Sequence, residues 1–231
     1  MGHVFLGVKP LPVALLALAA CSSAPRTTTI AVTWQMVGST VSVAAWSKDS
    51  SALLSAIGRM RDSTRSTDST SIRSAVRQAW AAERGELSPR LEWRDVVDSY
   101  VLDQAVPVLA AAADSALIDL GGLFLWVGPA TKRRVGIADP GNALDPVAHV
   151  ELQSGAISTV SGRGERRAVT VLAPTAFKAA AWSSALFSVG CDKALAQAAR
   201  RGISVVCADS AGVRWSPELQ NRFVLPPAHV P

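Results

Sequence analysis

The chain has 231 residues, with 23 Lys and Arg against 18 Asp and Glu, and its formal net charge is +5. Hydrophobic residues make up 49% of it, so a disordered chain is excluded. No run reaches the roughly 18 apolar residues of a membrane-spanning helix, which excludes a polytopic membrane protein, and three cysteines exclude a disulfide-rich miniature fold. The basic residues are scattered, without a stripe that carries interleaved aromatic residues, so no nucleic-acid partner is expected.

The N-terminus has the pattern of an export signal. Residues 1–20 carry one charge, Lys9, followed by an apolar stretch that is too short to span a bilayer. The sequence Leu18-Ala19-Ala20-Cys21 resembles a bacterial lipobox, in which the cysteine thiol receives a diacylglyceryl group. We therefore predict a lipoprotein of the bacterial cell envelope, anchored to the membrane through Cys21 and facing the periplasm or the cell exterior. An ordinary secretory signal with an unrelated cysteine is the alternative.

Four segments follow from this interpretation. They are a signal peptide at 1–20, the lipidated cysteine with a polar tether at 21–33, a single folded domain at 34–225 and a Pro-rich tail at 226–231.

The folded domain is expected to open with two strands, at 29–34 and 38–46, because both stretches are rich in Val, Thr and Ala. Asp49 is placed to cap a helix that follows, and Leu53, Ile57 and Met60 form its apolar face. The Ser- and Thr-rich stretch 62–74 predicts a solvated connection.

Two more helices are expected before the chain returns to strands. Ile72, Val76 and Trp80 form the apolar stripe of the first, which ends at Gly85. The second has its stripe at Val97, Val101, Ala105 and Val108, and Pro107 is expected to kink or shorten it.

From residue 116 onward, short apolar stretches are separated by Gly, Pro or Asp. They predict strands at 116–120, 123–127, 135–139, 150–153, 156–160 and 168–173. Thr175 and Asp192 are predicted to cap two helices, the second of which ends at Arg201-Gly202. Strands at 203–207 and 213–215 follow. This order predicts an α+β fold with a mostly antiparallel sheet flanked by helices.

Cysteines and histidines offer little chemistry in the mature chain. Cys191 and Cys207 either pair in an oxidising compartment or stay buried as small apolar residues, and we favour burial. His149 lies in an alternating stretch that is typical of a strand surface, and His229 lies in the Pro-rich tail. A histidine-based catalytic triad is therefore not expected.

Gly121-Gly122 ends a strand in a way that lets a ligand or another backbone approach, or else marks a tight bend. This segment is one of seven short motifs that follow one another along the chain: Met36-Val-Gly38-Ser39-Thr40, Tyr100-Val-Leu-Asp103, Ala116 to Gly122, Val135-Gly-Ile-Ala-Asp-Pro140, Gly155 to Gly162, Val169-Thr-Val and Ser183-Ser-Ala-Leu-Phe187. In this order they resemble the motifs of the ApbE family, the FAD:protein FMN transferases, which are typically bacterial lipoproteins.

The resemblance implies an ApbE-like, T-fold-like core and transfer of FMN from FAD to a Thr or Ser of a target flavoprotein, with release of AMP. Mg²⁺ would neutralise the pyrophosphate charge in such a reaction. The residues carried over for binding the flavin nucleotide are Met36, Tyr100, Asp103, Gly121, Gly122, Thr159 and Ser161. Ala180 and Ser184 fall on the metal positions, four residues apart on one helix.

The sequence departs from the family pattern at the positions that would carry the chemistry. Ala180 stands where the family has the metal-binding aspartate, and Asp98 stands where it has a lysine. Asp98 or Asp209 is a possible substitute ligand. A catalytically degenerate lipoprotein that binds a flavin or a protein partner is therefore the alternative function. For single residues, the alternatives are a solvated helix position for Asp103 and a core position for Tyr100.

Overall fold

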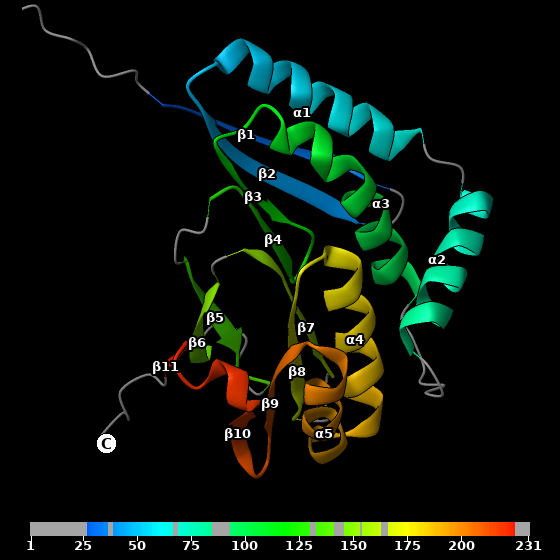
Figure 1. Ribbon diagram of the computed structural model, residues 1–231, viewed down its shortest axis with the longest axis vertical. Coiled ribbons are helices and arrows are strands. Elements are labelled where there is room, and N and C mark those ends of the chain that lie inside the picture. Colours follow the sequence, from blue (N-terminus) through cyan, green and yellow to red (C-terminus); the bar gives the residue numbers. More distant parts are fainter. Residues whose placement is uncertain are drawn as a thin grey trace, which may run out of the picture.

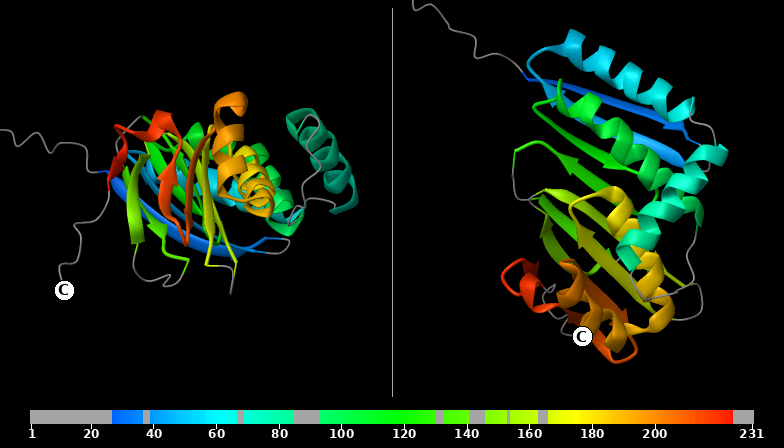
Figure 2. Two further views of the ribbon diagram at one scale, coloured as in Figure 1. Left: turned by 90° about the horizontal axis from the view of Figure 1, so that it is seen from below. Right: turned by 45° about the vertical axis from the view of Figure 1, so that its right-hand side comes forward.

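The computed structural model describes residues 27–36, 39–66, 69–84, 93–129, 133–140, 146–152, 154–162 and 166–224. In this part of the chain, helices cover one face of a large antiparallel sheet and a small sheet covers part of the other face (Figures 1 and 2). The predicted signal peptide, Cys21 and the Pro-rich tail lie outside the described residues.

The large sheet contains eight strands of the described chain, in the order β1-β2-β3-β4-β7-β8-β9-β10, and every neighbouring pair is antiparallel. The strands are β1 (Thr28–Gln35), β2 (Thr40–Ser47), β3 (Ser115–Asp119), β4 (Leu123–Val127), β7 (Gly155–Ser161), β8 (Ala168–Ala173), β9 (Ser204–Asp209) and β10 (Gly212–Trp215). The prediction of an α+β fold with an antiparallel sheet is confirmed.

The described part of the chain has five α-helices, of which four cover one face of this sheet while α2 (Ser69–Arg84) packs outside them (Figure 1). The four are α1 (Ser50–Arg65), α3 (Trp93–Ala110), α4 (Ala176–Val189) and α5 (Cys191–Arg201). Helices α1 and α3 lie over the β1–β3 half, α4 and α5 lie over the β7–β9 half, and α2 packs beside α3. Alternation along the strands supplies the core, because inward residues such as Val41 and Val43 are fully buried.

The opposite face of the large sheet carries a three-stranded sheet in the order β11-β6-β5. Its strands are β5 (Arg133–Ala138), β6 (Pro146–Leu152) and β11 (Phe223–Val224). Ile137, Val150 and Leu152 from this sheet form a second apolar core with Trp126 and Ile157 of the large sheet. The result is three layers, with the large sheet in the middle (Figure 2).

Most predicted elements are present within a few residues, and three local predictions are wrong. The stretch 62–74 is not a solvated connection, because α1 continues to Arg65 and α2 begins at Ser69. Asp192 does not cap α5, whose N-cap is Gly190; Asp192 lies in its first turn instead. Strand β1 begins at Thr28, inside the predicted tether.

Two features of the helices bear directly on the predictions. Asp49 caps α1, since its Oδ1 accepts a hydrogen bond from Ala52 N at 2.9 Å, and Thr175 caps α4 in the same way through Lys178 N. Pro107 does not stop α3, which runs three residues beyond it to Ala110.

In the described residues, none of the helices combines the length and apolar character that crossing a bilayer requires.

Candidate functional site

A small pocket lies where the turn between β3 and β4 meets β7 and α4. Its volume is about 30 Å³, which is room for roughly two water molecules. Its walls are Ser39, Leu120, Gly121, Gly122, Leu123, Ser158, Thr159, Val160, Ala180, Ser183 and Ser184. The fold therefore brings together five predicted site residues from three distant segments: Gly121, Gly122, Thr159, Ala180 and Ser184.

The Gly-Gly turn has a backbone that favours glycine at both positions. Gly121 has φ +59° and Gly122 has φ +101°, and side chains strain the backbone in this region. Gly121 N donates to Asp119 Oδ1 at 3.0 Å, and the Gly122 carbonyl accepts from Thr159 N at 3.2 Å. The turn is thereby fastened to β7, and its backbone forms one wall of the pocket.

Three hydroxyl groups that line the pocket, those of Ser158, Ser183 and Thr159, form hydrogen bonds within the protein. Ser183 Oγ donates to the Ala180 carbonyl at 3.1 Å, so the 2.9 Å contact between Ser158 and Ser183 has the Ser158 hydroxyl as donor. Thr159 Oγ1 lies 2.8 Å from Thr170 Oγ1. The first of these contacts joins β7 to α4 and the second joins β7 to β8, so these hydroxyl groups have partners within the protein itself.

The donor set of this pocket does not fit a magnesium ion. Ala180 and Ser184 lie one helical turn apart on α4 and both line the pocket, as their spacing predicted. All the described residues that line it are uncharged, however, and Mg²⁺ in proteins is held by at least one carboxylate in most sites. Among the described residues, no three His, Cys, Asp or Glu side chains gather as a metal site would require.

Asp103 lies on α3 outside this pocket and binds the start of α4. Its two carboxylate oxygens accept hydrogen bonds from Ala176 N at 2.9 Å and from Phe177 N at 2.8 Å. Burial raises the pKa of the Asp103 carboxyl above its ordinary value, although the hydrogen bonds from Phe177, Ala176 and Thr175 act in the opposite direction. Asp103 is therefore not the solvated helix residue of the alternative interpretation.

The remaining residues carried over from the resemblance lie apart from the pocket. Tyr100 packs edge-to-face on Phe177, with ring centroids 5.6 Å apart, in a core position. Met36 is buried in the main core, and its backbone N donates to Ser39 O at 2.8 Å. Ser161 is exposed at the end of β7, opposite Ala168.

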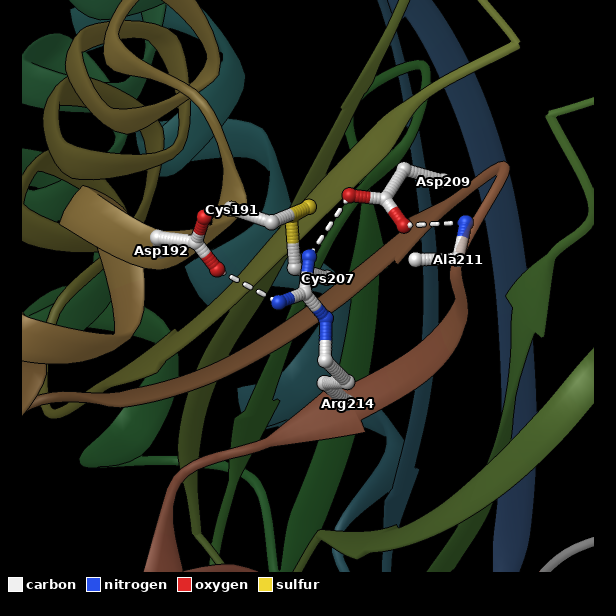
Figure 3. Close-up of a disulfide and its surroundings, with 6 residues drawn as sticks. All are labelled: Cys191, Asp192, Cys207, Asp209, Ala211 and Arg214. Carbon is white, nitrogen blue, oxygen red and sulfur yellow. Dashed lines mark hydrogen bonds and ion pairs between the residues drawn. A yellow bond between two sulfur atoms is a disulfide. The ribbon is translucent and has the colours of Figure 1, made fainter.

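Neither aspartate considered as a substitute metal ligand lines the pocket. Asp98 is buried within α3. Asp209 binds the Arg214 guanidinium at 2.7 Å, and the same guanidinium binds Asp192 (Figure 3). These two ion pairs join the first turn of α5 to strands β9 and β10.

Cys191 and Cys207 form a disulfide beside these ion pairs (Figure 3). The Cα atoms are 5.6 Å apart, and the bond joins the first residue of α5 to β9. Our preference for two unpaired, buried thiols is therefore wrong. Both side chains are indeed buried, but a spacing of 16 residues carries no information on whether two cysteines meet.

Ser39, Ser158 and Ser183 also line the pocket, although they were not selected as site residues. Each lies within one of the motifs that resemble the ApbE family, and this membership was the available signal. Serines are common, and their role here depends on strands and a helix that meet in space. Four tryptophans, Trp34, Trp80, Trp126 and Trp182, are at most 5% exposed and belong to the apolar cores.

The architecture and the pocket define the class: an α+β protein with helices on one face of an antiparallel sheet and a Gly-Gly turn facing a helix. No protein-family model and no curated protein sequence matches the chain. Solved structures do match it. The ApbE protein from Thermotoga maritima is 16% identical and covers 84% of this chain and 99% of its own, with a TM-score of 0.62.

Two further solved structures match the chain over the same extent. A single-site variant of the flavin transferase ApbE from Vibrio cholerae gives a TM-score of 0.65 at 13% identity, covering 84% of this chain and 99% of its own. The flavinyl transferase ApbE of Pseudomonas stutzeri gives 0.57 at 15% identity, covering 84% and 97%. The chain thus has an ApbE-like fold with a divergent sequence, as its motifs predicted.

Proposed function

We propose that this chain is a divergent ApbE-like protein that binds a flavin nucleotide without transferring it. The fold is shared with proteins named as flavin transferases, which supports a flavin as the ligand. The observation that carries the loss of transfer is the pocket around Ala180 and Ser184, whose volume is about 30 Å³ and whose described lining residues include no carboxylate. Phosphoryl transfer depends on neutralising phosphate charge, and these described residues carry no charge with which to hold a neutralising cation.

FMN transfer is the second candidate. In that reaction a Thr or Ser hydroxyl of a target flavoprotein attacks the FMN-side phosphorus of FAD, and AMP leaves. One observation favours it: Gly121, Gly122, Thr159 and Ser184 line a single pocket, in keeping with the motif resemblance. Transfer would require the divalent ion and the target to complete this site.

One experiment separates the two candidates. The mature protein is mixed with FAD, MgCl₂ and a flavin-accepting target domain, and the target is examined for covalent flavin fluorescence in a denaturing gel. We expect no fluorescent band, while FAD still raises the melting temperature of the protein. A Mg²⁺-dependent band that disappears in Ser184→Ala overturns the proposal in favour of transfer. Absence of both the band and the melting shift overturns flavin binding and leaves an interaction module.

We also propose that the protein is a lipoprotein of the cell envelope, anchored through Cys21. The disulfide between Cys191 and Cys207 supports this proposal, because disulfides persist in oxidising compartments. In a bacterial expression host, Cys21→Ala is expected to move the protein from the membrane fraction to the soluble fraction of the exported material. Unchanged membrane partitioning of this variant would exclude the lipid anchor.

A further inference from the structure

A second and larger cavity lies on the other face of the large sheet, between that sheet and the small one. Its volume is about 400 Å³, within the range of small-molecule sites. Its lining residues are Trp46, Leu117, Phe124, Trp126, Arg134, Val135, Gly136 and Leu152. The cavity is partly open to solvent, so it can admit a ligand.

The large sheet separates this cavity from the pocket at Ser184. Along β4, Leu123 and Leu125 belong to the core under the helices, whereas Trp126 belongs to the core under the small sheet and Phe124 packs against it. The two openings are therefore on opposite faces, and a side chain can be changed at one without contacting the other.

One wall of the cavity is aromatic. Trp46 on β2, Phe124 and Trp126 on β4, and Leu117 on β3 between them all line it. The rings of Trp46 and Trp126 are 5.9 Å apart and tilted by 45°. Trp46 and Phe124 are half-buried although they are large apolar groups. Such a surface favours a flat ring that covers the aromatic side chains.

The opposite wall is formed by the small sheet. Val135 and Leu152 line it, and Gly136 contributes backbone without a side chain. The space between these two walls, which we call the slot, has aromatic side chains on one side and aliphatic side chains and backbone on the other. A planar ring system fits a slot of this kind better than a bulky or branched ligand does.

Among the described residues that line the cavity, Arg134 is the charged one. It is exposed on the edge strand β5, and within the described part of the chain its guanidinium has no hydrogen bond or ion pair. A cation at the border of an otherwise apolar site is complementary to an acidic group on the ligand.

We propose that this cavity binds a planar aromatic ring system that carries an acidic group, with the ring between the two sheets and the acid at Arg134. The inference stands on the walls of the cavity and does not depend on the flavin function proposed above. FMN is one member of this ligand class, and the two proposals are tested separately.

The test uses two probes with the same rings, 8-anilinonaphthalene-1-sulfonate and the neutral N-phenyl-1-naphthylamine. We expect saturable binding of the sulfonate with one site per chain, followed by probe fluorescence. Arg134→Gln should weaken the sulfonate about fivefold, as expected for one partly exposed ion pair, and leave the neutral probe unchanged. Arg73→Gln, on the exposed side of α2, is the matched control and should change neither.

Two further variants test the position of the ring. Leu117→Trp fills the slot and should abolish binding of both probes, with its folding checked by thermal unfolding. Phe124→Ala removes one aromatic wall without filling the slot and should weaken both probes. Equal sulfonate binding in wild type, Arg134→Gln and Leu117→Trp would overturn the proposal. FMN binding that is lost in Leu117→Trp supports it, and sulfonate binding without FMN binding supports the cavity while contradicting the flavin function.

Discussion

Asp103 and Phe177 join α3 to the start of α4 through a 2.8 Å hydrogen bond from the Phe177 backbone N to the Asp103 carboxylate. The second carboxylate oxygen accepts from Ala176 N, so one side chain satisfies two of the four N–H groups that a helix leaves unpaired at its start. These contacts set the position of α4, the helix that carries Ala180 and Ser184 to the pocket.

Asp103→Ala is expected to lower the free energy of unfolding by about 1–2 kcal/mol, the usual cost of removing a capping side chain. Asp103→Asn keeps one acceptor oxygen and should cost less. Urea unfolding at neutral pH measures both. Gln104→Ala, on the exposed neighbouring position of α3, serves as control and should have little effect. A cost for Asp103→Ala no larger than that of the control would show that α4 does not depend on this cap.

The same carboxyl gives a pH prediction. Burial raises the pKa of Asp103 above its ordinary value of 3.8, so between that value and the raised pKa the folded protein holds a proton that the unfolded chain has lost. The contribution of this carboxyl group to the free energy of unfolding is then fully present below about pH 3.8 and declines as pH rises through the pKa of the folded state. The unfolding free energy of wild type minus that of Asp103→Asn should fall over this interval in a series of urea titrations. A rise would mean that the hydrogen bonds outweigh burial.

Arg201 of α5 holds the end of α2. Its two terminal nitrogens donate to the carbonyl oxygens of Glu83 and Arg84, each at 3.0 Å, and its guanidinium lies 5.2 Å from the Trp182 ring centroid. A cation is favourable at a helix C-terminus, where carbonyl groups are unpaired. Arg201→Ala should cost about 1–3 kcal/mol and should increase amide exchange in the last turn of α2.

Arg200→Ala is the matched control for this prediction, because Arg200 is exposed on the same turn of α5. Arg201→Lys should recover part of the loss, since a single ammonium keeps the charge but not the fork that reaches two carbonyls. If amide exchange in α2 is equally fast in the Arg200 and Arg201 variants, the contact does not stabilise that helix.

The disulfide closes a loop between residues separated by 16 positions. Loop entropy for this length predicts a loss of about 3 kcal/mol when the bond is removed. Cys191→Ala and Cys207→Ala should each show this loss, and the double variant should add little because a single bond is removed in every case. Thermal unfolding with and without a thiol reductant checks this prediction, since the reductant should lower the melting temperature of the wild type only. Reductant-sensitive unfolding in the double variant would contradict the assignment.

Local chemistry was sufficient to predict much of the fold. Asp49 and Thr175 were recognised as caps because their bonding partners lie three residues away, and the strands were recognised from alternation between turn residues. The prediction of a solvated connection at the Ser- and Thr-rich stretch 62–74 was wrong because tertiary contacts override the weak helix propensity of these residues. Thr64, for example, is buried in α1, where its hydroxyl accepts from Trp34 Nε1 at 3.0 Å.

The candidate site was less predictable because its geometry is nonlocal. Asp103 was selected as a ligand residue, yet its partners Ala176 and Phe177 are more than 70 positions away, and spacing along the chain cannot reveal such a contact. Gly121 and Gly122 were recoverable, since strand-ending glycines indicate a special backbone wherever they lie. The difference is whether the physical constraint acts within one turn or across the fold.

The pocket itself offers a direct test of why a metal is not expected. Ala180 is 3% exposed and lines the pocket one helical turn from Ser184. Ala180→Asp would place a carboxylate there, and without a metal its burial should lower the melting temperature. A large excess of MgCl₂ should then stabilise this variant by up to about 2.7 kcal/mol at a hundredfold excess over Kd, because the ion binds the folded state.

Ala180→Asn is the matched control, since it has nearly the same shape without the charge, and MgCl₂ should not raise its melting temperature. Wild type should not respond either, because the described residues that line the pocket carry no carboxylate and the Ser158 and Ser183 hydroxyls already have partners. A Mg²⁺-dependent rise in wild type would show that the ion binds without a carboxylate in the pocket, and FMN transfer would become the better candidate. A response confined to Ala180→Asp places the loss of the metal at this one position.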